Sequence, residues 1–159
     1  MLSLLKAGPY TIRGVSVAGI YTSLQVKELG VVLDLGLAPR GFCGTDQVFL
    51  SHAHVDHISG LAGLLGVRGM MRKSVPLRVY MPEEVVDDLR EALAALGRLQ
   101  HHALEFEAVG MAPGDECALP SGMLVRAFRF GTVADRPAMP VAHLTVRGRD
   151  GIWLTVEKR

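Results

Sequence analysis

The sequence predicts an α+β fold built on one mixed sheet, and two patterns support this prediction. Short runs rich in β-branched and aromatic residues, separated by glycine, occur early in the chain and again near its end. Two segments between these runs carry apolar residues at intervals of three and four, the spacing of an amphipathic helix. The 159 residues, 49% of them hydrophobic, suit one globular domain with a sizeable core.

Each element can be placed from these patterns. Strands that follow one another as a meander are expected at 10–17, 21–26, 31–34 and 48–51. One helix should follow His57, and a second should cover 83–99, after a strand at 77–81. Pro82 fits the first position of that helix, where no amide donor is needed. Further strands are expected at 104–108, 117–119, 124–130, 142–147 and 152–156.

Residues 52–57 read His-Ala-His-Val-Asp-His and follow the apolar run 47–51. In an extended chain, His52 and His54 point to the same side and can share one metal ion. Asp56 and His57 open the next helix, so the carboxylate lies in its first turn, where backbone amides favour an anion. Imidazole and carboxylate are the ligands of catalytic zinc.

Chance must be weighed against this metal site. Six histidines in a chain of this size can cluster, and a single histidine on an apolar face is usually a satisfied core group. Four ligand-type residues in six positions favour the metal interpretation instead. Cys43 and Cys117 are far apart in the chain and cannot form a thiolate site by themselves.

Charge and hydropathy limit the remaining possibilities. The formal net charge of +1, from 17 basic and 16 acidic residues, provides no overall field for a polyanion, so RNA binding would need a local patch. No apolar stretch approaches the about 20 residues of a membrane span, and the first six residues are too short for a signal peptide. We therefore expect a cytoplasmic protein with no membrane partner and reduced cysteines.

The motif HAHVDH after a strand, with Asp34-Leu35-Gly36 ending the strand before it, resembles the metallo-β-lactamase superfamily. The segments YTIRGVSVAG, VVLDLGLAPRG, FLSHAHVDHISGL and LVRAFRF resemble the short form of ribonuclease Z, the tRNA 3′-end processing endonuclease, over about residues 10–130. The resemblance implies a four-layer αββα sandwich. Residues 1–159 look like its first half, a single domain truncated at its C-terminus, with one mixed sheet and helices on one face.

The resemblance also implies roles for the motif. His52 and His54 would bind a first zinc ion, Asp56 and His57 a second, and a metal-bound hydroxide would cleave a phosphodiester of precursor tRNA. Asp56 is the implied catalytic residue, which would orient or deprotonate the attacking water. Asp34 is a candidate for holding a ligand histidine in the right tautomer, although Asp-Leu-Gly is equally consistent with a turn.

The sequence departs from the family pattern at the remaining ligands. Thr132 stands where the family has a histidine, and the chain stops at Arg159, before any bridging aspartate or final histidine. His143 could substitute, yet a histidine on a sheet face is the commoner explanation of its context. Asp135 lies in a turn that needs no catalytic role. The zinc site is therefore expected to be partial.

Three functions remain open: a ribonuclease Z-type hydrolase, a non-catalytic metal-binding or structural subunit, and a small-molecule hydrolase such as a thioesterase or lactonase. A half-sandwich would expose an apolar sheet face, which predicts a homodimer or a completing partner chain. The basic stretch 68–73 could contact RNA or form an ordinary solvated loop. His101 and His102 are assigned no site, because they fit a polar helix C-terminus.

Overall fold

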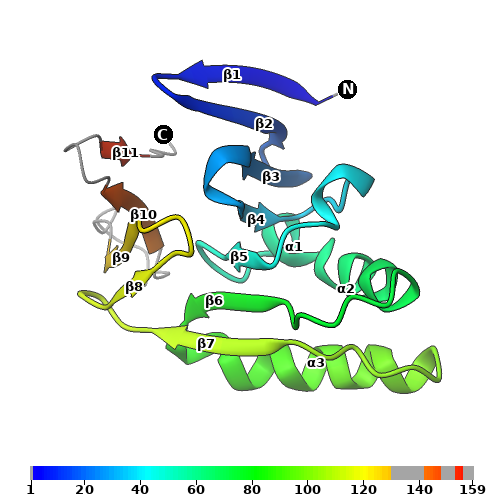
Figure 1. The fold of residues 1–159 in the computed structure, drawn as a ribbon. Coiled ribbons are helices and arrows are strands. Elements are labelled where there is room, and N and C mark those ends of the chain that lie inside the picture. The colour runs from blue at the N-terminus through cyan, green and yellow to red at the C-terminus, as the bar shows by residue number, and fades with distance from the viewer. Residues whose placement is uncertain (1, 130–141, 148–152, 156–159) are drawn as a thin grey trace.

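The computed structural model describes residues 2–129, 142–147 and 153–155, which form two sheets and a layer of helices (Figure 1). The larger sheet has seven strands in sequence order: β1 (Ser3–Ala7), β2 (Tyr10–Val17), β3 (Tyr21–Val26), β4 (Val31–Leu35), β5 (Gln47–Phe49), β6 (Arg78–Pro82) and β7 (Glu107–Met111). The smaller sheet is antiparallel, in the order β11 (Trp153–Thr155), β10 (Ala142–Arg147), β9 (Leu124–Arg129) and β8 (Glu116–Ala118).

The larger sheet is mixed, as predicted. Strands β1 to β4 form an antiparallel meander, and β4 to β7 run parallel to one another. Parallel neighbours need a crossover connection, and helical segments provide it after β5 and after β6. As a result the carboxyl ends of β4, β5 and β6 meet at one edge of the sheet.

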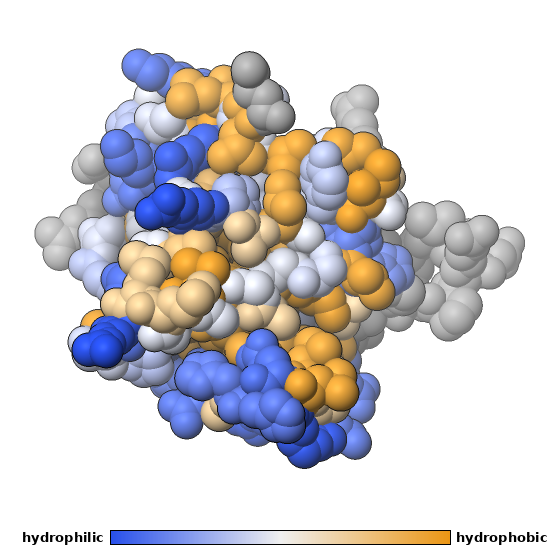
Figure 2. Space-filling view, turned by 90° about the vertical axis from the view of Figure 1, so that its right-hand side faces the viewer, coloured by the Kyte–Doolittle hydropathy of each residue, from blue (hydrophilic) through white to orange (hydrophobic). Residues whose placement is uncertain are grey.

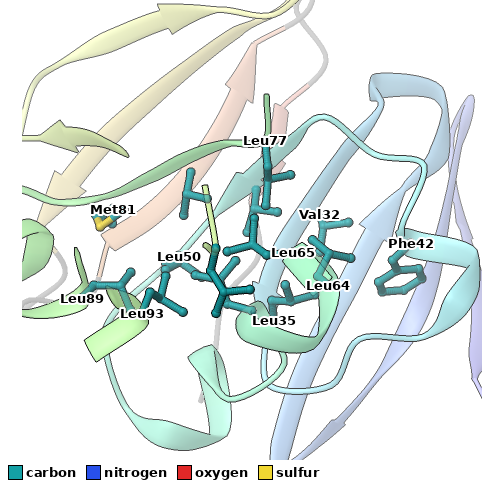
Figure 3. Packing of buried hydrophobic residues seen from close by; sticks show 14 of the residues in the cluster. Val32, Leu35, Phe42, Leu50, Leu64, Leu65, Leu77, Met81, Leu89 and Leu93 are labelled. Atoms are coloured by element: carbon teal, nitrogen blue, oxygen red, sulfur yellow. The ribbon is translucent and has the colours of Figure 1, made fainter. Parts of the chain in front are cut away.

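The helical segments are α1 (Val55–Ile58), α2 (Leu61–Met70) and α3 (Val86–Leu99), with short 3₁₀ turns η1 (Lys27–Leu29), η2 (Arg40–Phe42) and η3 (Glu83–Val85). Helices α2 and α3 cover one face of the larger sheet, as predicted. Their leucines form one buried cluster with residues of β4, β5 and β6 (Figure 3). The cluster includes Leu61, Leu64 and Leu65 of α2, Leu89 and Leu93 of α3, and Val32, Val48, Leu50, Val79 and Met81.

The opposite face of the larger sheet is covered by β9 and by the turn that joins β8 to β9. Leu119, Met123 and Val125 belong to a second buried cluster that also contains Val26, Val31, Leu33, Phe49 and Tyr80. The rings of Phe49 and Tyr80 stack there, with centroids 4.3 Å apart. The sequence predicted that this apolar face would be exposed. In the structure it is covered where it includes residues of β3, β4, β5 and β6.

Some element predictions were wrong in position. The strand expected at 104–108 is β7, at Glu107–Met111, because Leu104 packs into the helix-side core instead. Strand β1 was not predicted, because its residues are mostly exposed and carry no clear alternation. The expected strands 10–17, 21–26 and 142–147 coincide with β2, β3 and β10.

Several large apolar side chains lie on the surface near the ends of α2 and α3. Met70, Met71 and Leu99 are each more than half exposed. On the face seen from the right of Figure 1, hydrophobic side chains form separate groups between hydrophilic ones (Figure 2). Self-association remains a prediction. Within the described residues, none of the helices has both the length and the apolar character needed to span a bilayer.

Arg68 lies in the last turn of α2 and anchors the loop that follows η2. Its side chain is almost completely buried and donates hydrogen bonds to the carbonyl oxygens of Cys43, Thr45 and Val75, and to the carboxylate of Asp46. The stretch 68–73 is therefore not a continuous exposed basic patch, because its first cation is turned inward. The prediction from charge alone was wrong for this residue.

We expect Arg68→Met to lower the free energy of unfolding by about 3 kcal/mol, because it leaves buried carbonyl oxygens unsatisfied and removes the closer of the two cations beside Asp46. Urea denaturation of the matched variant Arg98→Met, at an exposed position of α3, should differ from the wild type by less than about 0.5 kcal/mol. Equal effects of the two substitutions would contradict the structural role.

Candidate metal centre

The four motif residues lie at the carboxyl edge of the parallel strands. Strand β5 ends at Phe49, the amide of Leu50 still bonds to the Tyr80 carbonyl at 2.8 Å, and the chain then leaves the sheet. His54 is extended, with φ −64° and ψ 145°, and helix α1 begins at the next residue. Asp56 is thus in the first turn of a helix, as predicted.

The motif divides into two pairs of donor atoms. His52 Nε2 and His54 Nδ1 lie 2.9 Å apart, and Asp56 Oδ2 and His57 Nε2 lie 3.4 Å apart. Two ligands of one tetrahedral zinc ion, each about 2.0–2.1 Å from the metal, are about 3.3 Å from each other. Both pairs therefore have nearly the spacing of ligands that share an ion. The pairs are adjacent, because the ring centroids of His52 and His57 are 4.0 Å apart.

The donor atoms are of the kinds that bind divalent metals, and they lie in two close pairs. Within the residues that the structure describes, no group of three or more His, Cys, Asp or Glu side chains is arranged around a common metal position. Thr132 and Asp135 lie outside the described residues. The backbone of His143 lies in β10, opposite Phe128 of β9.

Asp34 is placed by a β-bulge in β4. Ser23 pairs with Leu35 and Leu24 pairs with Leu33, so Asp34 is the extra residue, and its φ is +53°. Aspartate is among the few residues that adopt this left-handed conformation readily. The bulge also resets the alternation of the strand, because Leu33 and Leu35 pack into opposite core clusters.

The bulge directs the Asp34 carboxylate toward the motif. Its Oδ2 lies 2.7 Å from His57 Nδ1, and its Oδ1 accepts a hydrogen bond of 2.7 Å from the Ser51 amide. Because an ionised carboxylate can only accept a hydrogen bond, this contact requires a proton on His57 Nδ1, and the other ring nitrogen, Nε2, faces Asp56. The contact predicted for Asp34 is present, and Asp34 lies within a strand, so the turn interpretation was wrong.

Close backbone contacts hold α1 against the end of β4. A Cβ atom at Gly36 would lie 1.9 Å from the Asp56 carbonyl oxygen, so only glycine fits there. A Cβ at Gly60 would lie 2.8 Å from the Leu35 carbonyl oxygen, which accepts a hydrogen bond from the Gly60 amide. The position of Asp56 therefore depends on two glycines on either side of the contact.

Two residues of the site were missed from the sequence. The amide of Gly19, in the turn between β2 and β3, donates a hydrogen bond of 3.1 Å to Asp56 Oδ2. The hydroxyl of Ser51 lies between Asp34 and His52. The only signal for Ser51 was its place before the motif, and no signal pointed to Gly19, which is 37 residues from its partner.

Comparisons with known proteins agree with this architecture. The family model described as beta-lactamase superfamily domain matches residues 36–150. A nuclear ribonuclease Z of Triticum aestivum is 31% identical over 79% of this chain and 70% of its own length. The chloroplastic tRNase Z TRZ2 of Arabidopsis thaliana is 31% identical over 75% of this chain. The chain belongs to the metallo-β-lactamase superfamily, in its ribonuclease Z branch.

The extent of the matches shows that the chain corresponds to part of the family fold. It spans 33% of tRNase Z TRZ2 and 42% of tRNase Z TRZ1, both of Arabidopsis thaliana. Among solved structures, the metallo-beta-lactamase fold protein YhfI of Bacillus subtilis is 12% identical, with a TM-score of 0.62 over 89% of this chain and 56% of YhfI. The Zn(2+)-bound PqqB of Methylobacterium extorquens has a TM-score of 0.53, with 13% identity, over 91% of this chain and 51% of PqqB. The prediction of a partial metallo-β-lactamase fold with a mixed sheet is confirmed, although a second sheet of four strands is present where one sheet was expected.

We expect Asp34→Asn to lower the affinity for zinc by about 10- to 100-fold. Asparagine tolerates the positive φ, but it replaces one carboxylate oxygen by an NH2 donor, so its single oxygen cannot accept from both His57 and the Ser51 amide. Competition with a chromophoric chelator measures this affinity. The matched variant Asp115→Asn, at an exposed turn distant in sequence, should bind zinc like the wild type. Unchanged affinity in Asp34→Asn would contradict the orienting role.

Proposed function

We propose that this chain supplies the first four ligands of a dinuclear zinc site in a hydrolase of the ribonuclease Z type, which cleaves precursor tRNA at its 3′ end. The observation that carries the proposal is the division of the motif into two donor pairs, His52 with His54 and Asp56 with His57. A single structural ion would need its donors converging on one position, whereas two adjacent pairs suit two neighbouring ions.

Each residue has a role in this proposal. His52 and His54 hold one ion, and Asp56 and His57 hold the other. When bound, the ions supply Lewis acidity, which makes water acidic enough to attack at neutral pH and balances charge on the phosphodiester. Asp56 orients the attacking water and accepts its proton, while the Gly19 amide fixes the direction of its carboxylate. Asp34 fixes the orientation of the His57 ring through its hydrogen bond with Nδ1.

The substrate is proposed from the relatives, several of which are named tRNase Z or ribonuclease Z. The exposed cations Arg72 and Lys73 follow α2 and provide a small local positive charge. A cytoplasmic location is consistent with Cys43 and Cys117, which are both free thiols. We propose that the remaining donors come from residues beyond those described or from a second chain in a homodimer or a mixed complex.

A second candidate function is that of a binding subunit that keeps half of a metal site without catalysis. The observation that favours it is that each donor pair, within the described part of the chain, has two members rather than three. Catalytic zinc ordinarily has three protein ligands and one exchangeable position. The two candidates differ in whether the bound metal ever completes its coordination.

Cleavage of a precursor tRNA carrying a 3′ trailer, with added zinc or manganese, separates the two candidates. We expect His54→Ala to reduce the cleavage rate to below about one per cent of the wild-type rate, because one ion loses half of its donors in this segment. His102→Ala, which removes an exposed histidine after α3, should cleave at the wild-type rate.

The metal content of the same samples completes the test. Metal bound by the wild type and lost in His54→Ala, together with no cleavage by either protein, would favour the binding subunit. Wild-type protein purified without chelator that contains no metal, and takes up none, would overturn both candidates.

A further inference from the structure

The hydroxyl of Ser51 is the centre of a hydrogen-bond cluster beneath the motif. Its oxygen lies 2.9 Å from each carboxylate oxygen of Asp34 and 2.9 Å from Nδ1 of His52. It also lies 3.5 Å from Nδ1 of His57, which bonds directly to Asp34 at 2.7 Å. Ser51 is therefore the group that connects Asp34 with His52, whereas His57 reaches Asp34 by itself.

The direction of these bonds follows from the number of protons. A serine hydroxyl has one proton to donate, and an ionised carboxylate has none. The Ser51 hydroxyl therefore donates to Asp34 and must accept at its second contact. The donor at that contact is His52 Nδ1, so the proton of the neutral ring is on Nδ1 and the lone pair is on Nε2.

We infer that Ser51 is a positioning residue that extends the influence of Asp34 to His52, so that one buried carboxylate sets the tautomer of one histidine in each donor pair. Asp34 acts on His57 directly and on His52 through the Ser51 hydroxyl. Both rings then present Nε2 toward the second member of their pair. This inference rests on the proposed metal-binding roles of the motif.

Loss of the hydroxyl should affect His52 more than His57. Loss of the Ser51 hydroxyl removes the contact that holds the proton on His52 Nδ1, so we expect the ring to shift toward the tautomer protonated on Nε2. A proton on Nε2 blocks the nitrogen that faces His54. His57 keeps its direct contact with Asp34. The Ser51 amide also keeps its own hydrogen bond to Asp34 Oδ1, so substitution of the side chain leaves the backbone anchored.

The test is a comparison of Ser51→Ala with Ser51→Thr, which retains a hydroxyl at a half-buried position. Nitrogen-detected NMR of the histidine rings in metal-free protein reports which nitrogen carries the proton. In the wild type, we expect the proton on Nδ1 in both His52 and His57. In Ser51→Ala, we expect it to move to Nε2 in His52 and to stay on Nδ1 in His57. Ser51→Thr should show the wild-type pattern.

Zinc affinity, measured by competition with a chelator, is the second readout. Ser51→Ala should bind about 10- to 100-fold more weakly than the wild type, and Ser51→Thr should recover most of this loss. Nδ1–H retained at His52 in Ser51→Ala would overturn the inference, as would Nε2–H at His52 in the wild type itself. The wild-type measurement can overturn the inference by itself, even if Ser51→Ala fails to fold.

The outcome is separable from that of the proposed function. If the wild type shows the expected tautomers but neither binds zinc nor cleaves the trailer, the proposed hydrolase is wrong and the Ser51 relay stands as a structural feature. If the protein binds zinc while the affinity and the tautomer of His52 are unchanged in Ser51→Ala, the relay is wrong and the proposed function is unaffected.

Discussion

The hydrogen bonds of the Asp34 carboxylate are the interaction on which the site depends. Burial of a carboxylate is costly unless donors compensate for lost water, and the left-handed backbone of Asp34 adds a further cost. The amide and hydroxyl of Ser51 and the ring of His57 provide this compensation. These groups belong to the chain that leaves β5, the parallel neighbour of β4. The pairing of two strands thus brings the carboxylate next to the segment that it orders.

A change in backbone conformation within six residues explains the two donor pairs. Up to His54 the chain is extended, so residues two apart in sequence face the same way, and His52 meets His54. From Val55 the chain is helical, and the neighbours Asp56 and His57 can approach one position. Gly36 fixes where this change occurs, because the Asp56 carbonyl packs directly on its Cα. A longer strand or a later helix would bring the four donors into a different arrangement.

The sequence predicted the parts of the molecule that depend on local pattern. The amphipathic spacing of α3 and the antiparallel pairing of β2 to β4 are local, and both are present where they were expected. The meander was wrong for the strand at 48–51, because β5 pairs parallel with β4 after a crossover connection. The parts that failed depend on partners distant in sequence. In the sequence, Arg68 is the first residue of a basic stretch. In the structure, its guanidinium group donates hydrogen bonds to the carbonyl oxygens of Cys43 and Thr45. In the site, the ligand types were evident, whereas the bulge at Asp34 and the contact between Gly19 and Asp56 arise only from strand register.

The difference between a hydrolase and a metal-binding subunit comes down to one donor for each ion. Two protein ligands leave a zinc ion with at least two positions for water, which weakens binding and leaves the reactive water without a defined direction. A third ligand at each ion fixes the metal and leaves one position where water can be aligned with a phosphodiester. The orientation of His52 and His57 by Asp34 serves either function, because a histidine with the wrong tautomer cannot bind at all. In the proposed site, the four described donors therefore define where any further donors would have to lie, next to His54 for one ion and next to Asp56 for the other.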